Sequence, residues 1–340
     1  MLAKLTFALV LLAACGVALA DQPGQSGADQ PVARPDSKPA GDRAAGEPVP
    51  LNKSGTILID RPGKRLLLKT KVVCRECALE MLLCKSQTKE HESILAIDGQ
   101  AYVIHTGLLA LGARSGAPVQ YVRPKPGGEP GEFIDDFRPP TGHRIDIFLQ
   151  WTDEKGKPRR VKAQDWMRYA TRQFFAAPLG TLPDIKLPED SNLRYDKRHQ
   201  ELSWYGTMSE LERQRFLALS NDEAYRKAVR ELFEKSQIRP MKADFVFAGS
   251  SFYVDEEGQR FYQAESGDVI CVANFPTALI DVAVASTASG EDNLLFESWT
   301  ERIPPLGTEV IVELVPAFKD GKPVIAGGKD EPPAATDETP

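Results

Sequence analysis

Apolar and polar residues alternate along several short stretches of the chain, a pattern that is typical of half-buried β-strands. In the clearest stretch, 144–152, one face carries four large apolar side chains: Ile145, Ile147, Leu149 and Trp151. The turn sequence at 153–157 then predicts a hairpin whose second strand covers 159–163. The same reasoning predicts further strands at 56–60, 65–73, 269–273 and 309–315. It also predicts a second hairpin, which joins a strand at 245–254 to a strand at 260–264.

Helical spacing of apolar residues predicts one packed helix over about 100–113. A pair of charged helices is predicted at about 207–237, where the sequences that start at Thr207 and Ser220 have the form of capping boxes. We interpret this pair as part of an insertion, 180–240, in a mainly β region. The predicted fold class is therefore α+β, with mainly antiparallel strands and hairpins.

The first twenty residues predict export. Lys4 is followed by an apolar run at 5–12, which is shorter than the roughly 20 residues that cross a bilayer core, and small residues follow, as in a secretory signal. Cleavage after Ala20 fits an ordinary signal peptidase, whereas the sequence around Cys15 resembles a lipobox, in which Cys15 becomes the lipidated first residue. Both alternatives stay open. In the second, the chain contacts the membrane only through that N-terminal lipid.

Two segments are predicted to be disordered. Residues 21–50 are rich in Pro and Gly and contain no aromatic residue, so they cannot bury enough apolar surface to offset the entropy of ordering. They form the expected tether, and the acidic, Pro-rich segment 319–340 forms an expected tail. Between them, 51–318 is the predicted folded domain.

Composition and motifs exclude some classes of function. The chain is 42% hydrophobic and 26% charged, as in an ordinary globular protein. Its formal net charge of −6 and its lack of a concentrated basic stripe argue against nucleic acid as a partner. There is no GxSxG nucleophile elbow, phosphate-binding loop or GxGxxG motif, so a hydrolase or nucleotide-binding function has no support and we lean against an enzyme.

The four cysteines after Cys15 are an even number, which in an exported chain favours disulfides. Cys74 and Cys77 form a CxxC motif, which predicts either a redox site at the start of a helix over 78–83 or a structural disulfide. We favour structural pairing, which could include a Cys84–Cys271 disulfide. Cys271 could equally be a buried free thiol.

Cys84, His91 and His105 are candidate ligands for a transition metal, because thiolate and imidazole groups bind such ions. Their spacing matches no zinc motif, and His91-Glu92 does not begin an HExxH sequence. The structural alternative is that His105 is a boundary residue and that His91 lies in a solvated turn. We predict no cofactor, with a transition metal as the alternative. The aromatic residues of the second hairpin are predicted to be core and cross-strand pairs rather than a ligand platform: Phe252, Tyr253, Phe261 and Tyr262.

Several sequence blocks resemble the YdjY domain family and its longer version in exported proteins of planctomycete-type bacteria. The blocks are 84–95, 101–113, 164–166, 244–250, 267–271, 274–276 and 301–308. The resemblance implies a coherent fold and export, but no catalytic residue, because the family has no established activity. Some relatives carry an iron–sulfur module, whose four-cysteine run is missing from this sequence.

These observations favour a non-enzymatic binding or structural module of the cell envelope, exported to the periplasm or tethered to a membrane as a lipoprotein. Its expected partner is another envelope protein or a surface component. The charged helical segment and the tether support this hypothesis. The alternative is a redox or metal-binding protein that uses the Cys and His residues.

Overall fold

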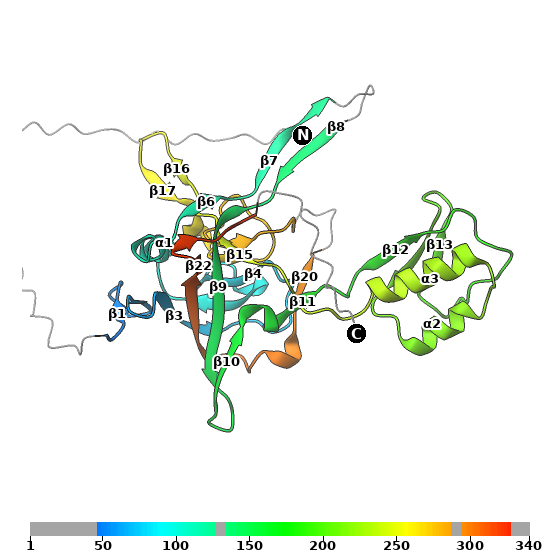
Figure 1. The fold of residues 1–340 in the computed structure, drawn as a ribbon, viewed down its shortest axis with the longest axis horizontal. Coiled ribbons are helices and arrows are strands. Elements are labelled where there is room, and N and C mark those ends of the chain that lie inside the picture. Colours follow the sequence, from blue (N-terminus) through cyan, green and yellow to red (C-terminus); the bar gives the residue numbers. More distant parts are fainter. Residues whose placement is uncertain (1–45, 127–132, 287–293, 328–340) are drawn as a thin grey trace, which may run out of the picture. The chain divides into compact units, whose positions relative to one another are not determined.

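The computed structural model describes residues 46–126, 133–286 and 294–327 (Figure 1). The predicted export signal with Cys15, and nearly all of the predicted tether, lie outside these residues. The segments 21–50 and 319–340, which were predicted to be disordered, each contain a short strand in the part that the structure describes, so the prediction is wrong there. β1 (Val49–Pro50) pairs with β2 (Ile57–Asp60), and β24 (Ile325–Ala326) pairs with β9 (Thr141–Thr152).

One large sheet dominates the fold. Its central path runs in the order β18, β4, β5, β3, β21, β9, β15, β19, and only β4 and β5 pair in parallel. The path nearly closes on itself, because Ile270 of β18 forms a bridge with Ile280, next to β19. The strands not yet delimited are β18 Ile270–Cys271, β4 Met81–Lys85, β5 Ser93–Ile97, β3 Arg65–Val72, β21 Glu309–Pro316, β15 Phe245–Phe247, β19 Asp281–Val282, β10 Pro158–Lys162 and β6 Ser115–Ala117.

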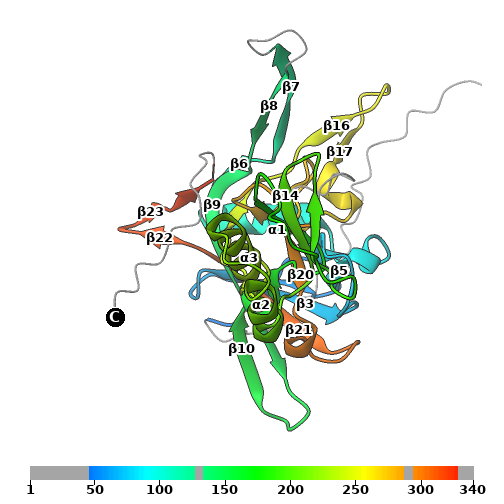
Figure 2. The same cartoon turned by 90° about the vertical axis from the view of Figure 1, so that its right-hand side faces the viewer.

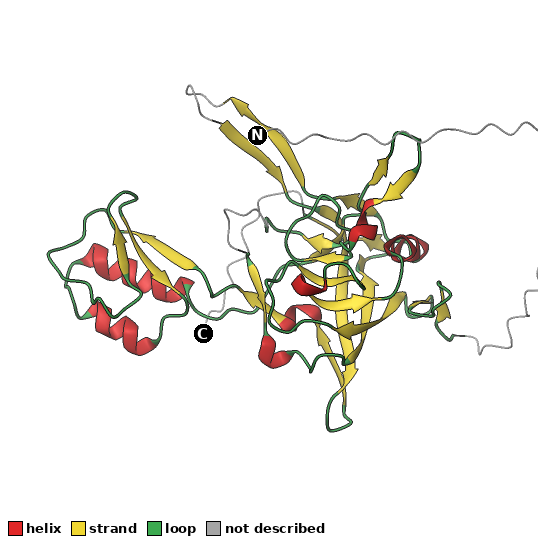
Figure 3. Ribbon diagram, turned by 180° about the vertical axis from the view of Figure 1, so that it is seen from behind, coloured by secondary structure: helices red, strands yellow, loops and turns green. Residues whose placement is uncertain are grey.

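The predicted α+β class is wrong: the protein is mainly β, and a nearly closed, barrel-like sheet rather than a set of hairpins dominates the fold (Figure 3). The expected helices do form within the described residues, as α1 (Ala101–Ala110), α2 (Glu210–Leu217) and α3 (Glu223–Lys235), but they are short. The error arose because many of the strands are short and end in a turn, so the local pattern suggested hairpins. Closure depends on pairing between strands that are far apart in sequence, such as β3 with β21.

The predicted alternation in β9 is confirmed at its apolar face. Ile145, Ile147 and Leu149 are buried in the main core, whereas their neighbours along the strand are less buried. Helix α1 packs against this core through Ile104 and Leu108. It approaches the sheet closely because a Cβ at Gly107 would lie only 2.9 Å from the Leu66 side chain.

The helical segment has a core of its own, separate from the main one. Helix α3 packs on a small sheet with the order β12, β14, β13, and α2 packs on α3 (Figure 2). The helices start at different caps from those predicted. Ser209 and Asp222 accept hydrogen bonds from the backbone N–H groups of Glu212 and Tyr225. The strands are β12 Phe174–Pro178, β13 Arg194–Asp196 and β14 Glu201–Tyr205.

The remaining elements are small. The predicted strand at 245–254 divides in two, because Gly249 (φ +93°) and Ser250 (φ 55°) have left-handed backbones. Its first part is β15 of the main sheet, and its second part is β16. The other elements are β16 Phe252–Val254, β17 Arg260–Tyr262, β7 Gln120–Pro126, β8 Phe133–Arg138, β11 Met167–Tyr169, β20 Phe296–Ser298, β22 Phe318–Lys319, β23 Lys322–Pro323 and the 3-10 helices η1 Glu90–Glu92, η2 Ala163–Trp166, η3 Gln263–Ser266 and η4 Thr300–Arg302. In the part of the chain that the structure describes, none of the helices has the length and hydrophobicity needed to cross a membrane.

Candidate functional site

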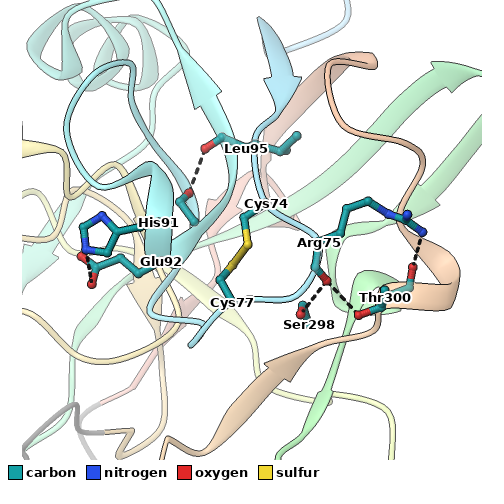
Figure 4. Close-up of a disulfide and its surroundings, with 9 residues drawn as sticks. Cys74, Arg75, Cys77, His91, Glu92, Leu95, Ser298 and Thr300 are labelled. Atoms are coloured by element: carbon teal, nitrogen blue, oxygen red, sulfur yellow. Dashed lines mark hydrogen bonds and ion pairs between the residues drawn. A yellow bond between two sulfur atoms is a disulfide. The ribbon is translucent and has the colours of Figure 1, made fainter.

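The CxxC motif lies in the loop that joins β3 to β4, and Cys74 and Cys77 form a disulfide there (Figure 4). Both cysteines are partly exposed. The helix that a thioredoxin-type site requires is absent from 78–83, because 78–80 is irregular and Met81 already begins β4. No helix N-terminus therefore acts on these thiols, and the disulfide rather than a helix defines the geometry of the loop.

Hydrogen bonds of Arg75, between the two cysteines, anchor this disulfide loop. The backbone oxygen of Arg75 accepts hydrogen bonds from Ser298 Oγ at 2.9 Å and Thr300 Oγ1 at 2.8 Å (Figure 4). Its guanidinium donates to the carbonyl oxygens of Thr300 and Ile303 at 3.0 and 3.1 Å. The loop is thus attached to a segment more than 220 residues away along the chain, independently of the disulfide.

The second expected disulfide is not formed. Cys84 and Cys271 are free thiols, and both are completely buried in a small apolar cluster with Met81, Ala96 and Ala278. Burial raises the pKa of both thiols, that of Cys271 strongly. Because the thiolate is the reactive form, these two residues behave as small apolar side chains in the folded protein.

The candidate metal ligands are not brought together. The side chain of His91 is 78% exposed and lies beside Glu92, while His105 lies in α1 and Cys84 is buried. Among the described residues, no group of three or more His, Cys, Asp or Glu side chains is arranged to hold a metal ion. The sequence suggested this site because ligand types were close along the chain, but their side chains point to different environments.

The acidic and basic residues around η1 form a structural cluster instead. Lys89 Nζ lies 2.8 Å from the buried carboxylate of Asp268, and the hydrogen bond and charge of Asp268 raise the pKa of Lys89 despite the opposing effect of burial. Burial and the nearby Glu92 raise the pKa of Glu80. These contacts hold η1 against the loop that precedes β18.

His105 supports the base of the β16–β17 hairpin. Its Nδ1 lies 2.8 Å from the hydroxyl of Tyr262, which itself donates to the carbonyl oxygen of Gly249 at 3.0 Å. Since the Tyr262 proton is used in that bond, Nδ1 carries a proton and donates to Tyr262. Burial lowers the pKa of His105, which favours this neutral form.

The β16–β17 hairpin is a separate two-stranded sheet (Figure 1). It carries exposed aromatic residues. We call Tyr102, Phe252, Tyr253 and Phe261 the aromatic surface; their exposed fractions lie between 43% and 55%. The predicted cross-strand pairs form, Phe252 with Tyr262 and Tyr253 with Phe261. The prediction that these residues belong to the core is wrong for three of them and holds only for Tyr262, which is buried. Alternation alone could not distinguish the two cases, because it does not reveal whether a second layer covers the hairpin.

A cavity of about 410 Å³ lies beside the disulfide loop. Cys77, Ala78 and Leu79 line one side of it, and β11 and β20 contribute Arg168, Phe296 and Glu297. Sequence reasoning missed this cavity, because its walls come from three segments that are remote in the sequence. A size of several hundred cubic ångströms suits a small organic ligand.

Arg168 and Glu297 form the principal charged pair of this cavity. Arg168 Nε donates to Glu297 Oε1 at 2.6 Å, and Glu297 also accepts hydrogen bonds from the backbone N–H and the hydroxyl of Thr171. A second pair, Arg172 with Glu76, is more exposed. The first pair is therefore fixed, while the second can exchange its partner for water or a ligand.

The fold and these sites define a mainly β domain with an anchored disulfide loop. The model of the YdjY domain matches residues 57–177 and 196–315, well over half of the chain, and the chain belongs to this family. The unmatched gap at 178–195 ends before α2 and α3, so both helices lie within the matched residues. No curated protein and no solved structure shows a significant match.

Proposed function

We propose that this YdjY domain is a binding module that docks a protein partner through the aromatic surface. The observation that carries the proposal is the exposure of Phe252, Tyr253 and Phe261 on a hairpin outside the main sheet. Several exposed apolar side chains on one element of a folded protein commonly mark an interaction site. Aromatic residues are also the usual energetic anchors of protein interfaces.

Both faces of the hairpin take part. Phe252 is paired with Tyr262 across the strands, and Tyr253 with Phe261, so the two pairs lie on opposite faces. An isolated two-stranded hairpin is marginally stable in water. Within the described residues, only the first face is supported, through Tyr262 and Tyr102. Covering the second face would stabilise the hairpin and remove apolar area from water.

Charge indicates the chemistry of the partner. The hairpin turn contains Asp255, Glu256 and Glu257, whereas its cation, Arg260, stacks over the Phe252 ring at 4.5 Å. A complementary partner therefore has apolar side chains flanked by Lys or Arg. We propose a protein segment of this kind as the partner. Binding of a second copy of the chain, or of a neutral glycan, at this surface would contradict the proposal.

A random peptide library displayed on phage tests this choice. Selection on the full chain should enrich peptides with apolar residues next to Lys or Arg, and these should bind the double variant Tyr253→Ser/Phe261→Ser at least about tenfold more weakly. Phe174→Ser, which alters another exposed aromatic residue, serves as the matched control and should bind normally. Enrichment of acidic peptides, equal binding to the variant, or no enrichment would reject the proposal, as would concentration-dependent dimerisation that the double variant abolishes.

A second candidate function is thiol–disulfide exchange at Cys74 and Cys77. A disulfide that closes so short a loop constrains the unfolded chain by only about 2 kcal/mol, and Arg75 already anchors this loop. In the exchange, a protein dithiol would give two electrons and two protons to the Cys74–Cys77 bond and leave as a disulfide. Equilibration in glutathione buffers tests the idea: a midpoint potential above about −270 mV supports it, and one below about −300 mV marks a structural disulfide.

We also propose that the domain acts outside the cytoplasm, in the periplasm or cell envelope. The N-terminal signal pattern supports this location. The Cys74–Cys77 disulfide is consistent with it, because disulfides persist in oxidising compartments.

A further inference from the structure

We propose that the cavity beside the disulfide loop binds the carboxylate of an apolar organic acid, with Arg168 as the residue that recognises it. This site is distinct from the aromatic surface, and nothing in the family assignment provides for it. The ligand class covers a free aryl or alkyl carboxylic acid and the C-terminal residue of a peptide, which share a carboxylate attached to an apolar body.

Arg168 is oriented before any ligand arrives. Its side chain is only 14% exposed, and Nε is held by Glu297 at 2.6 Å. Glu297 is itself held by the backbone N–H and the hydroxyl of Thr171, at 3.2 and 2.9 Å. One edge of the guanidinium is therefore fixed by a carboxylate that cannot easily rotate.

The opposite end of the same guanidinium is available. Within the described residues, the terminal nitrogens Nη1 and Nη2 of Arg168 have no hydrogen-bond partner, although Arg168 lines the cavity. These nitrogens carry four of the five N–H donors of an arginine. Two of them in parallel match the two oxygens of a carboxylate, which is the strongest and most directional pairing that a guanidinium makes.

The rest of the cavity is suited to an apolar body. Leu79, Phe296 and Ala170 contribute apolar lining, and Ala78 and Leu294 extend it. The second cation, Arg172, is tied to Glu76 in an exposed pair, so it can add attraction at low ionic strength. Because each arginine of the cavity already faces a glutamate, the site is close to neutral, and modest affinity that weakens with salt is expected.

The test compares an acid with its amide on the full, oxidised chain. The probes are phenylacetate, phenylacetamide, and a short blocked peptide ending in phenylalanine, prepared both as the free acid and as the amide. Calorimetric titration should detect each acid and show at least about tenfold weaker binding of its amide. Binding of phenylacetate alone would assign the site to free acids, and preference for the peptide acid would assign it to peptide C-termini.

Variants locate the site. Arg168→Gln should weaken acid binding at least about tenfold. Arg168→Lys should restore only part of the affinity, because the lysine ammonium is a point charge and cannot make the paired contact. Arg302→Gln is the matched control, since Arg302 also stacks on Trp299 but does not line the cavity. Phe261→Ser should leave acid binding unchanged, which separates this site from the aromatic surface.

Equal binding of acid and amide to the wild-type chain would overturn the proposal. This comparison needs no variant, so the test does not depend on correct folding of Arg168→Gln. Undiminished acid binding by a folded Arg168→Gln would also overturn it. Absence of acid binding at millimolar concentration would do the same.

Discussion

The carboxylate of Glu313 on β21 lies 2.8 Å from Nη1 of Arg65 on the neighbouring strand β3. The Glu313 side chain is completely buried, and its other oxygen lies 2.7 Å from Arg160 Nη2 on β10. Arg160 also stacks on the Phe148 ring at 3.7 Å. One buried charge therefore joins β21 to strands on both of its sides and helps to hold the large sheet together.

Replacement of Glu313 by Gln should lower the free energy of unfolding by about 2 kcal/mol, because it removes the charge from two hydrogen-bonded pairs whose carboxylate is buried and whose arginines are partly exposed. Urea unfolding followed by circular dichroism measures the change. Glu309→Gln, an exposed residue at the start of the same strand, is the matched control and should change stability by less than about 0.5 kcal/mol. A Glu313→Gln variant as stable as the wild type would show that solvent compensates the arginines.

Acid should weaken the folded state through His105. Because burial lowers its pKa in the folded protein, the unfolded chain takes up the proton first. The free energy of unfolding should fall as the pH decreases from about 6.5 toward the lower pKa of the folded state, by less than about 1 kcal/mol because the ring is partly solvated.

The difference between wild type and His105→Gln isolates this effect from that of His199, whose pKa is raised by Asp196 and which acts in the opposite direction. Urea unfolding at pH 7.5 and 5.5 measures it. His91→Gln, which alters an exposed histidine, is the control. A His105→Gln variant that keeps the full pH dependence would assign it to other groups.

Cys84 and Cys271 should resist alkylation in the native protein at pH 8. Both thiols are buried and their pKa values are raised, so the reactive thiolate is scarce and inaccessible. Peptide mass mapping after iodoacetamide should find both residues modified only when the chain is denatured first. Rapid native labelling of either residue would mean that the β4–β18 edge opens readily.

The location of the protein has its own test. If Cys15 is lipidated, the wild-type chain should fractionate with membranes and Cys15→Ser should be released in soluble form. Unchanged fractionation would leave cleavage after Ala20 as the remaining alternative. Recovery of the full-length chain from the cytosol would contradict export altogether.

The sequence predicted individual elements better than their arrangement. Alternation located β9, and helical spacing located α1, because each pattern records which side of one segment faces a core. The same reasoning misjudged 245–254, since two consecutive residues with positive φ interrupt it. It also placed the hairpin aromatics in the core, although no strand or helix among the described residues covers Tyr253 and Phe261 enough to bury them.

At the candidate site, too, the sequence predicted single motifs better than their arrangement in space. The CxxC motif was evident and its disulfide is present; from the chain alone we favoured a structural disulfide, with a redox site as the alternative. Proximity along the chain suggested Cys84, His91 and His105 as ligands, whereas folding separates their environments. The hydrogen bonds of Arg168 and Arg75 could not be anticipated, because their partners lie 129 and more than 220 residues away.

By itself, the sequence indicated the family, the positions of helices α1, α2 and α3 and of several strands of the large sheet, and the presence of a CxxC motif. Only the tertiary structure decided that the strands join one nearly closed sheet, that His105 supports Tyr262, and that Arg168 faces a cavity. The physical reason is that backbone hydrogen-bonding groups are alike in every strand. Which edges pair is therefore selected by burial summed over the whole chain, a quantity that no local pattern contains.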